Sequence, residues 1–314
     1  MQVTFVIPLY NCLPLTQAMV ASLQASLPAN LAPEIILVDD GSTDGTREWL
    51  ATLLPPFRVV LNERNLGYAA ASNRGAAVAR GDFLALLNND LVLSPGWLEP
   101  MLAAHRRLGT RAGLVGNVQC NARTGAVDHA GIFINLKGKL EHIRTRPSPL
   151  ARFLAPVRRV GAVTGACVLL DRVLWRQLGG FDEGYVNGSE DVDLCLRALD
   201  AGRVNAVALR SVVRHHVSAS PRRKARDEEN TYRFTRRWRH ELWRLIGRHW
   251  CWQYLEAYWL SSRNPAEHAM ARRMLFYTLH LRRTPPPEAF IALNAALDAE
   301  IARWQAMFGS PGKT

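Results

Sequence analysis

The chain has 314 residues, of which 48% are hydrophobic and 21% are charged. This composition is typical of a globular protein and excludes a collagen-like or intrinsically disordered chain. Its five cysteines are odd in number and form no C-x-x-C pair, which argues against a disulfide framework or a zinc knuckle. We therefore expect a protein of a reducing cytosol, long enough for two domains or for one domain with an extension.

The net charge is +12, from 39 basic and 27 acidic side chains. Such a balance is typical of proteins that meet polyanions, including nucleic acid, anionic lipid and phosphorylated substrates. The excess is largest in residues 221–314, where 17 basic side chains stand against 9 acidic ones and six of the nine tryptophans occur. The N-terminus has no basic segment before its apolar run, and no stretch approaches about 20 apolar residues, so we expect neither secretion nor a membrane span.

Short apolar runs alternate with helical stretches in the first part of the chain. Four runs are expected to be strands, at residues 3–7, 34–38, 58–61 and 83–87. Because they are apolar on both faces, they predict an α/β fold with a mainly parallel sheet flanked by helices. Two further strands are expected in the second stretch of the chain, at Val160–Leu170 and Val204–Val213.

Polar clusters follow three of the first four strands, at residues 8–11, 39–44 and 88–90. The carboxyl ends of parallel strands meet at one edge of a sheet, where ligands bind, so the three clusters predict one site. A carboxylate at Asp90 can hold a hard divalent cation. Asp39 and Asp40 also suit an ordinary turn, and that simpler interpretation stays open. Neither a P-loop nor a dinucleotide fingerprint occurs.

A second group of titratable residues lies further along the chain. Glu190, Asp191 and Asp193 follow Ser189 at an expected helix start, where crowded acids indicate a base or a site that faces cations. His215 and His216 end an apolar strand, and since side chains alternate across a strand, only one of them can share a site with Asp90. One buried and one solvated histidine is the competing interpretation.

The motifs, in this order and spacing, resemble those of the inverting glycosyltransferases of family 2, which have the GT-A nucleotide-sugar fold. The resemblance covers residues 3–220 and rests on VIPLYN, ILVDDGSTDGT, NERNLGYAAASNRG, GDFLALLNNDLVLSPGWL, VTGACVLLDR, LGGFDEGYVNGSEDVDLCLRALDAG and HHVSAS. It is strongest to the bacterial rhamnosyltransferase-like branch, which assembles cell-surface polysaccharides. It implies a GT-A catalytic domain over 1–220, with a nucleotide-sugar-binding half (1–109) and an acceptor half (110–220), followed by a helical extension over 221–314.

The resemblance also implies roles for individual residues. Asp191 matches the catalytic base, Glu190 an acceptor contact, and Asp90 with His215 the ligands of Mn2+ or Mg2+. Asp40 matches the residue that hydrogen-bonds a uracil or thymine base. The residues expected to bind the nucleotide-sugar are Pro8, Tyr10, Asn11, Asp39, Asp40, Gly67, Asn73, Asn89 and Asp90. Asn88-Asn89-Asp90 departs from the family's Asp-x-Asp, so only Asp90 offers a carboxylate to a metal.

These assignments predict an enzyme that transfers a sugar from a UDP- or dTDP-sugar donor to a saccharide or lipid-linked acceptor in cell-surface polysaccharide synthesis, with dTDP-rhamnose as one candidate donor. Asp191 would take the proton of the acceptor hydroxyl, which then attacks the anomeric carbon from the face opposite the diphosphate and inverts its configuration. The alternative is a non-catalytic relative that binds nucleotide-sugars. Its support is the reduced Asn-Asn-Asp motif, and the presence of Asp191 and Asp90 argues against it.

The tail is expected to form a helix from Thr231 to Leu260 with one basic stripe. Arg233, Arg237, Arg244 and Arg248 follow helical spacing, while the tryptophans lie largely off their face. This pattern suits a peripheral helix on an anionic membrane surface at the inner face of the membrane. An apolar face packed on protein, with the arginines in water, explains it equally well. No nucleic-acid partner is expected, because base stacking needs aromatic residues on the basic surface.

Overall fold

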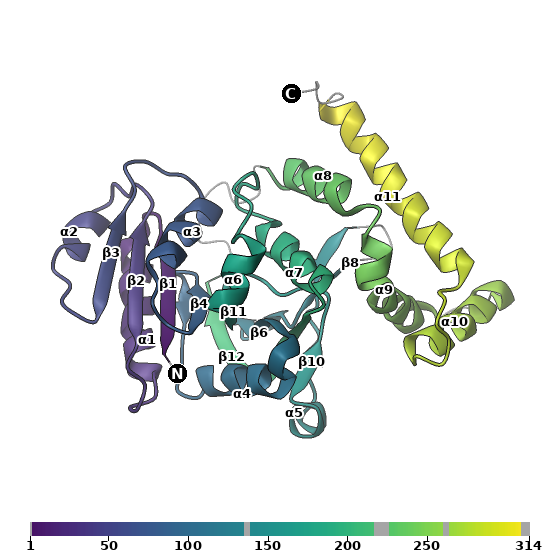
Figure 1. The fold of residues 1–314 in the computed structure, drawn as a ribbon, viewed down its shortest axis with the longest axis horizontal. Helices are drawn as coiled ribbons and strands as arrows, with labels where there is room; N and C mark the ends of the chain where they lie inside the picture. Colours follow the sequence, from purple (N-terminus) through teal and green to yellow (C-terminus); the bar gives the residue numbers. More distant parts are fainter. Residues whose placement is uncertain (1, 135–138, 217–225, 260–263, 309–314) are drawn as a thin grey trace. The chain divides into compact units, whose positions relative to one another are not determined.

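The computed structural model describes residues 2–134, 139–216, 226–259 and 264–308. The chain forms two compact units, residues 1–132 with 142–226 and residues 133–141 with 227–314 (Figure 1). The expected boundary at residue 220 lies outside the described residues. Within the described ranges, no helix is both long and apolar enough to cross a bilayer.

The first unit alternates strands and helices along the chain. Its elements are β1 (Val3–Leu9), α1 (Leu13–Ser26), β2 (Glu34–Asp39), α2 (Thr46–Leu50), β3 (Phe57–Leu61), α3 (Tyr68–Val78), β4 (Phe83–Leu87), β5 (Leu91–Val92), α4 (Leu98–Leu108), the 3-10 helix η1 (Gly109–Arg111), β6 (Ala112–Asn121), β7 (Val127–His129), α5 (Pro149–Leu154), β10 (Val157–Arg159), β11 (Cys167–Asp171), α6 (Arg172–Leu178), α7 (Glu190–Asp200) and β12 (Val204–His215). Two short strands, β8 (Ile132–Ile134) and β9 (Leu140–His142), pair with each other.

The large sheet has ten strands, with β10-β12-β6-β11-β4-β1-β2-β3 side by side and β5 and β7 added at β12 and β6. Strand β1 lies parallel to both β2 and β4, and β2 lies parallel to β3. Strand β11 is antiparallel to both β4 and β6. The mixed, mainly parallel sheet predicted from the sequence is therefore confirmed, and all four expected strands of the first half are present.

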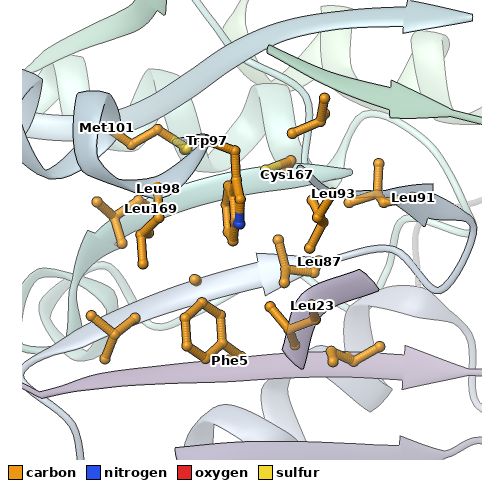
Figure 2. Close-up of a cluster of buried hydrophobic side chains, with 14 of the residues drawn as sticks. Phe5, Leu23, Leu87, Leu91, Leu93, Trp97, Leu98, Met101, Cys167 and Leu169 are labelled. Carbon is orange, nitrogen blue, oxygen red and sulfur yellow. The ribbon is translucent and has the colours of Figure 1, made fainter. Parts of the chain in front are cut away.

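Alternation along β1 explains why both faces of the sheet are apolar. Phe5 and Ile7 join a buried cluster with helices α1 and α4, and the ring centroids of Phe5 and Trp97 lie 6.2 Å apart. Figure 2 shows Trp97 between residues of α4, β11 and β4 in this cluster. Val6 points to the other face, which α3 covers. Burial on both faces fixes the strand register, because a slip of one residue would exchange the two faces.

The strand expected at Val160–Leu170 is wrong in its first half. Strand β11 begins only at Cys167, and residues 160–166 form an irregular segment. The reason is that Gly165 directs its peptide groups to side chains instead of to a neighbouring strand: its N–H donates to Asp191 and its carbonyl accepts from Tyr68. Strand β12 runs from Val204 to His215, slightly longer than expected.

The second unit contains helices α8 (Asp227–Trp238), α9 (Leu242–Tyr258), α10 (Pro265–Thr278) and α11 (Pro287–Phe308). The prediction of a single helix over 231–260 is wrong, because helix α8 ends at Trp238 and a separate helix, α9, begins at Leu242. The four arginines therefore do not form one continuous stripe. The guanidinium of Arg248 stacks on the ring of Tyr277 at 4.1 Å, and Trp238, Trp250 and Trp304 are buried.

A substitution at Gly75 tests the packing of α3 on the sheet. A methyl group added there would lie 2.4 Å from Val6 Cγ1 and 2.8 Å from Val38 Cγ2. Alanine gains about 1 kcal/mol over glycine in a helix, but overpacking a buried contact costs about 1–3 kcal/mol. Both contacts are shorter than 3.0 Å, so the overpacking cost should lie in the upper part of that range, at about 2–3 kcal/mol, and we expect Gly75→Ala to lower the free energy of unfolding in denaturant by about 1–2 kcal/mol. A second change, Val6→Ala, should remove part of that loss, and a Gly75→Ala protein as stable as its parent would contradict the packing.

Candidate active site

One pocket lies at the carboxyl ends of the parallel strands and encloses about 380 Å³. Segments that are far apart in the sequence line it, because β1, β2 and β4 end at the same edge of the sheet. The start of α3, the irregular segment before β11 and the start of α7 complete the wall. The lining residues are Pro8, Leu9, Tyr10, Asp40, Asn65, Tyr68, Ala71, Asn88, Asn89, Asp90, Thr164, Gly165, Ala166, Asn187, Gly188, Glu190 and Asp191.

Asp40 reaches the pocket wall with its carboxylate largely occupied. Its oxygens accept hydrogen bonds from the Asn62 amide at 2.7 Å, from the Leu66 N–H at 3.0 and 3.1 Å and from the Gly67 N–H at 2.9 Å. The residue is only 3% exposed. A carboxylate offers about four acceptor positions, so one position on Oδ2 remains once Leu66 is assigned to Oδ1. The main role of Asp40 is therefore to hold the loop before α3. Its carboxylate can accept one further hydrogen bond.

Asp39 lies behind the lining. Its carboxylate accepts from the N–H groups of Gly41 and Ser42 and pairs with Arg47, whose Nε is 2.7 Å away. This is the turn role that the simpler interpretation gave to the aspartate pair, and it applies to Asp39 but not to Asp40. Asp39 keeps the turn after β2 in shape, and that turn in turn places Asp40.

Asp90 lines the pocket, and His215 lies against it just behind the lining. Asp90 Oδ1 lies 3.0 Å from His215 Nε2, and both atoms are buried. Although this distance is short enough for an ion pair, the orientation does not make a hydrogen bond, and neither atom has another partner in the described part of the chain. His216, the next residue, is exposed, and its N–H donates to the carbonyl of Asp90. His215 is thus the histidine that faces Asp90.

The separation of these two atoms fits a shared cation. Neighbouring ligands of an octahedral ion, each about 2.1 Å from it, lie about 3 Å apart. An imidazole nitrogen with a carboxylate oxygen also suits Mn2+. Among the described residues no third His, Cys, Asp or Glu completes the set, so a bound cation would take its other ligands from a diphosphate and from water. The donor atoms present therefore fit a divalent metal.

The start of α7 brings two acids into the pocket. Asp191 accepts from the Gly165 N–H with Oδ2 and from the Val192 N–H with Oδ1, both at 2.8 Å. Glu190 is buried, and its Oε2 accepts from the Gly188 N–H at 2.7 Å. The helix begins at Glu190, as expected, but Ser189, at a φ of 72°, makes no side-chain hydrogen bond that would cap it.

Asp193, the third acid of this group, does not line the pocket. It is fully buried and forms an ion pair with Arg197 at 2.8 Å on the same helix. Its role is structural. Only two of the three crowded acids can therefore take part in chemistry.

Tyr68 and Gly165 support Asp191 from the opposite wall. The Tyr68 hydroxyl donates to the Gly165 carbonyl at 2.8 Å, and the N–H of the same glycine donates to Asp191. Burial, followed by the nearby charges of Glu190 and Asp191, holds the pKa of Tyr68 well above its usual value. The phenol therefore stays protonated at neutral pH and can donate to Gly165, which in turn donates to Asp191.

Three further residues of the expected nucleotide site stand behind the lining. Asn11 accepts from the Thr43 N–H, and its own N–H donates to Ser42. Gly67, with a φ of 92°, precedes α3 and donates to Asp40. Asn73 joins α3 to the loop at Phe181, to which it both donates and accepts at 2.9 Å. The structure gives these residues supporting places, whereas Pro8, Tyr10, Asn89 and Asp90 line the pocket as expected.

Some lining residues received no role from the sequence. Tyr68 and Gly165 lie within the motifs NERNLGYAAASNRG and VTGACVLLDR, but nothing in the sequence shows that these motifs meet. Asn187 accepts from the Tyr68 N–H at 3.3 Å and joins them. In the sequence, only their position within the family's motifs marked Tyr68, Gly165 and Asn187 as candidate site residues. The chemistry of their side chains did not.

The pocket is strongly acidic. Asp40, Asp90, Glu190 and Asp191 line it, and no lysine or arginine does so in the part of the chain that the structure describes. A diphosphate would meet four carboxylates there without a basic side chain to offset them. The pocket therefore suits a negatively charged ligand only together with a cation, which agrees with the fit of Asp90 and His215.

Known proteins resemble this chain in sequence. The family model "Glycosyl transferase family 2" matches residues 4–174. An O-antigen biosynthesis protein of Myxococcus xanthus is 34% identical over 203 residues, which are 61% of this chain and 16% of that protein. An N-acetylglucosaminyl-diphospho-decaprenol L-rhamnosyltransferase of Mycobacterium tuberculosis is 29% identical over 232 residues, 67% of this chain and 75% of that protein. The chain spans 16% and 27% of the length of two curated relatives that it matches.

The fold also resembles a solved structure. GalNAc-T7 with UDP, GalNAc and Mn2+ has a TM-score of 0.59 at 16% identity, covering 98% of this chain and 56% of that one. At this identity the likeness shows the fold alone, and it is the GT-A-like fold that the motifs predict. Because the family model spans more than half of the residues, the chain belongs to glycosyltransferase family 2.

Proposed function

We propose that the chain is an inverting glycosyltransferase that moves a sugar from a UDP- or dTDP-sugar to a saccharide or lipid-linked acceptor, with Asp191 as the base. The observation that carries the proposal is the position of Asp191 in the pocket wall, lining the same cavity as Asp90, which His215 contacts from behind the lining. Family membership supports sugar transfer from a nucleotide donor. The base, the donor and the acceptor are our inference from the site.

Asp191 suits the role of base because main-chain N–H groups hold its carboxylate and occupy only some of its acceptor positions. Gly165 and Val192 fix the two oxygens, and the lone pairs that they leave can accept from a sugar hydroxyl. Removal of that proton makes the oxygen a nucleophile for a single displacement, which inverts the anomeric carbon. Glu190, beside it, would hold a second hydroxyl of the acceptor.

Asp90 and His215 would hold a divalent metal, which neutralises charge on the departing diphosphate. The amide N–H of Asn89 donates to the Thr16 hydroxyl at 2.9 Å. The residue ties the loop after β4 to α1. It thereby helps to position Asp90, its neighbour in the chain.

A donor such as dTDP-rhamnose and an acceptor in a membrane are the finer part of the proposal. The mycobacterial relative is named as an L-rhamnosyltransferase that acts on a decaprenol-linked sugar, and the Myxococcus relative as an O-antigen biosynthesis protein. We infer a similar task in cell-surface polysaccharide synthesis for this chain, from the cytosolic side of a membrane. The second candidate, a non-catalytic relative that binds nucleotide-sugars, would keep the pocket and lack transfer.

The donor is tested by the thermal stabilisation that nucleotides give with and without Mn2+, because a ligand that binds only the folded protein raises its Tm. We expect UDP or dTDP to stabilise in the presence of Mn2+, since the free acceptor position of Asp40 suits the ring N–H of uracil or thymine. Cytosine lacks that donor. If only cytidine or guanosine diphosphate stabilises the protein, Asp40 serves the loop alone and does not read the base.

The base is tested by Asp191→Asn. The amide keeps the shape but cannot take a proton, so transfer should fall about a hundredfold or more while donor-induced stabilisation remains. Transfer within a few-fold of the parent protein would remove Asp191 as the base. Loss of donor stabilisation as well would show that the change disturbs the pocket wall.

The support for Asp191 is tested by Tyr68→Phe, which removes the hydroxyl bond to Gly165. We expect kcat to fall about tenfold with little change in the KM of the donor, because a displaced base slows chemistry more than binding. Tyr185→Phe is the matched control, since Tyr185 donates to Asp193, which does not line the pocket. Equal kcat values for the two variants would contradict the chain from Tyr68 to Asp191.

The metal site is tested by replacing each histidine with alanine. His215→Ala should raise the Mn2+ concentration needed both for UDP-dependent thermal stabilisation and for transfer, whereas His216→Ala should leave it unchanged. The reason is that the His215 imidazole faces the Asp90 carboxylate, whereas His216 contacts Asp90 through its main-chain N–H. A shift for His216→Ala alone would mean that the register is off by one residue, and no shift for either would leave the metal on Asp90 and the diphosphate.

A further inference from the structure

The turn between α10 and α11 carries an apolar surface that is open to solvent. Phe276 is 49% exposed, Leu279 52% and Leu281 71%. These three residues, together with Arg282 and Arg283, are here called the α10–α11 turn surface. In the second unit Trp238, Trp250 and Trp304 are buried, and Leu281 is the most exposed of its large apolar side chains. Five others are also exposed: Trp252, Trp259, Phe290, Ile291 and Met307.

The backbone at the end of α10 brings the three apolar residues together. The Leu281 N–H donates to the Phe276 carbonyl at 2.9 Å and the His280 N–H to the Tyr277 carbonyl at 3.1 Å, with His280 at a φ of 62°. This pair of bonds is a Schellman motif, which places the residue after the left-handed one against the helix residue five positions earlier. Leu281 therefore lies beside Phe276. Leu279, three residues after Phe276, is also its neighbour on the helix surface.

The segment around this surface carries only positive charge. Residues 268–287 contain four arginines and neither aspartate nor glutamate. Arg273 pairs with Glu288 at 3.0 Å. Arg272, Arg282 and Arg283 are exposed, and within the described residues no ion pair is recorded for them. An apolar tip with unneutralised arginines at its edge fits a surface that is both apolar and anionic.

We propose that the α10–α11 turn surface binds the surface of an anionic lipid bilayer, with Phe276, Leu279 and Leu281 among the headgroups and Arg282 and Arg283 against lipid phosphates. A bilayer offers an apolar region directly below a plane of negative charge, and the two parts of this surface match that order. The surface replaces the broken arginine stripe of α8 and α9 as the membrane contact. It rests on the second unit alone and does not depend on the reaction proposed above.

The test is sedimentation of the full-length protein with vesicles of phosphatidylcholine and of phosphatidylcholine mixed with phosphatidylglycerol. We expect binding to the mixed vesicles only, and weaker binding as salt rises. Arg282→Ala/Arg283→Ala should weaken the binding about thirtyfold, since each basic residue at an anionic surface contributes about fivefold. The control Arg106→Ala/Arg107→Ala removes the same charge from the exposed end of α4 and should lower the binding much less.

The apolar part is tested by Leu281→Glu, with Leu54→Glu as its control, because Leu54 is equally exposed at 76% but lies in the first unit. We expect Leu281→Glu to weaken vesicle binding about tenfold or more and Leu54→Glu to have little effect, with both Tm values unchanged. Equal binding by the turn variants and their controls, or no binding to anionic vesicles by the parent protein, would overturn the proposal. So would a dimer in sedimentation equilibrium that Leu281→Glu dissociates, since a second copy of the chain would then cover the surface.

Discussion

The site depends on two carboxylates, the buried Asp40 and the half-buried Asp191, that main-chain N–H groups hold in place. Asp40 joins the end of β2 to the loop before α3 by accepting from Leu66 and Gly67, and Asp191 joins the start of α7 to the segment before β11 by accepting from Gly165. Each bond links two segments that are distant in sequence. A charged acceptor roughly doubles the strength of a hydrogen bond and is costly to leave unpaired when buried. The pocket wall is therefore fixed by the same acids that give it its charge.

The sheet could be predicted from the sequence because its strands are apolar on both faces and short. The apolar runs at 3–7 and 34–38 must be buried in any compact fold, and strands β1 and β2 coincide closely with them. The region around Gly165 could not be predicted in the same way. Its apolar residues suggested one strand from Val160 to Leu170, but side chains of α3 and α7 claim the peptide groups of Gly165. Long-range hydrogen bonds decided this segment, and local pattern does not contain them.

The site residues divide along the same line. Tyr10 and Asp90 could be placed in one site because each lies shortly after a strand of the parallel sheet, where topology sets the position. Asp191 was expected there only because it matches the family's catalytic base. Asn73 lies in the second turn of α3, and its amide binds the loop at Phe181, a partner that sequence spacing does not reveal. The prediction for residues 221–314 failed for a related reason. Helical spacing predicted one stripe of arginines, but Arg248 stacks on Tyr277 inside the unit, since an arginine stem packs well on an aromatic face.

The acidic lining of the pocket has one physical consequence for the proposed reaction. Four carboxylates around one pocket repel each other and any diphosphate, so the site lowers its energy when a cation enters with the ligand. Asp90 and His215 contribute only one negative charge to that cation, fewer than two aspartates would. Such a pair binds a metal weakly by itself and more tightly once a diphosphate adds its own oxygens. Metal and donor then stabilise each other's binding reciprocally, as two ligands of one site must.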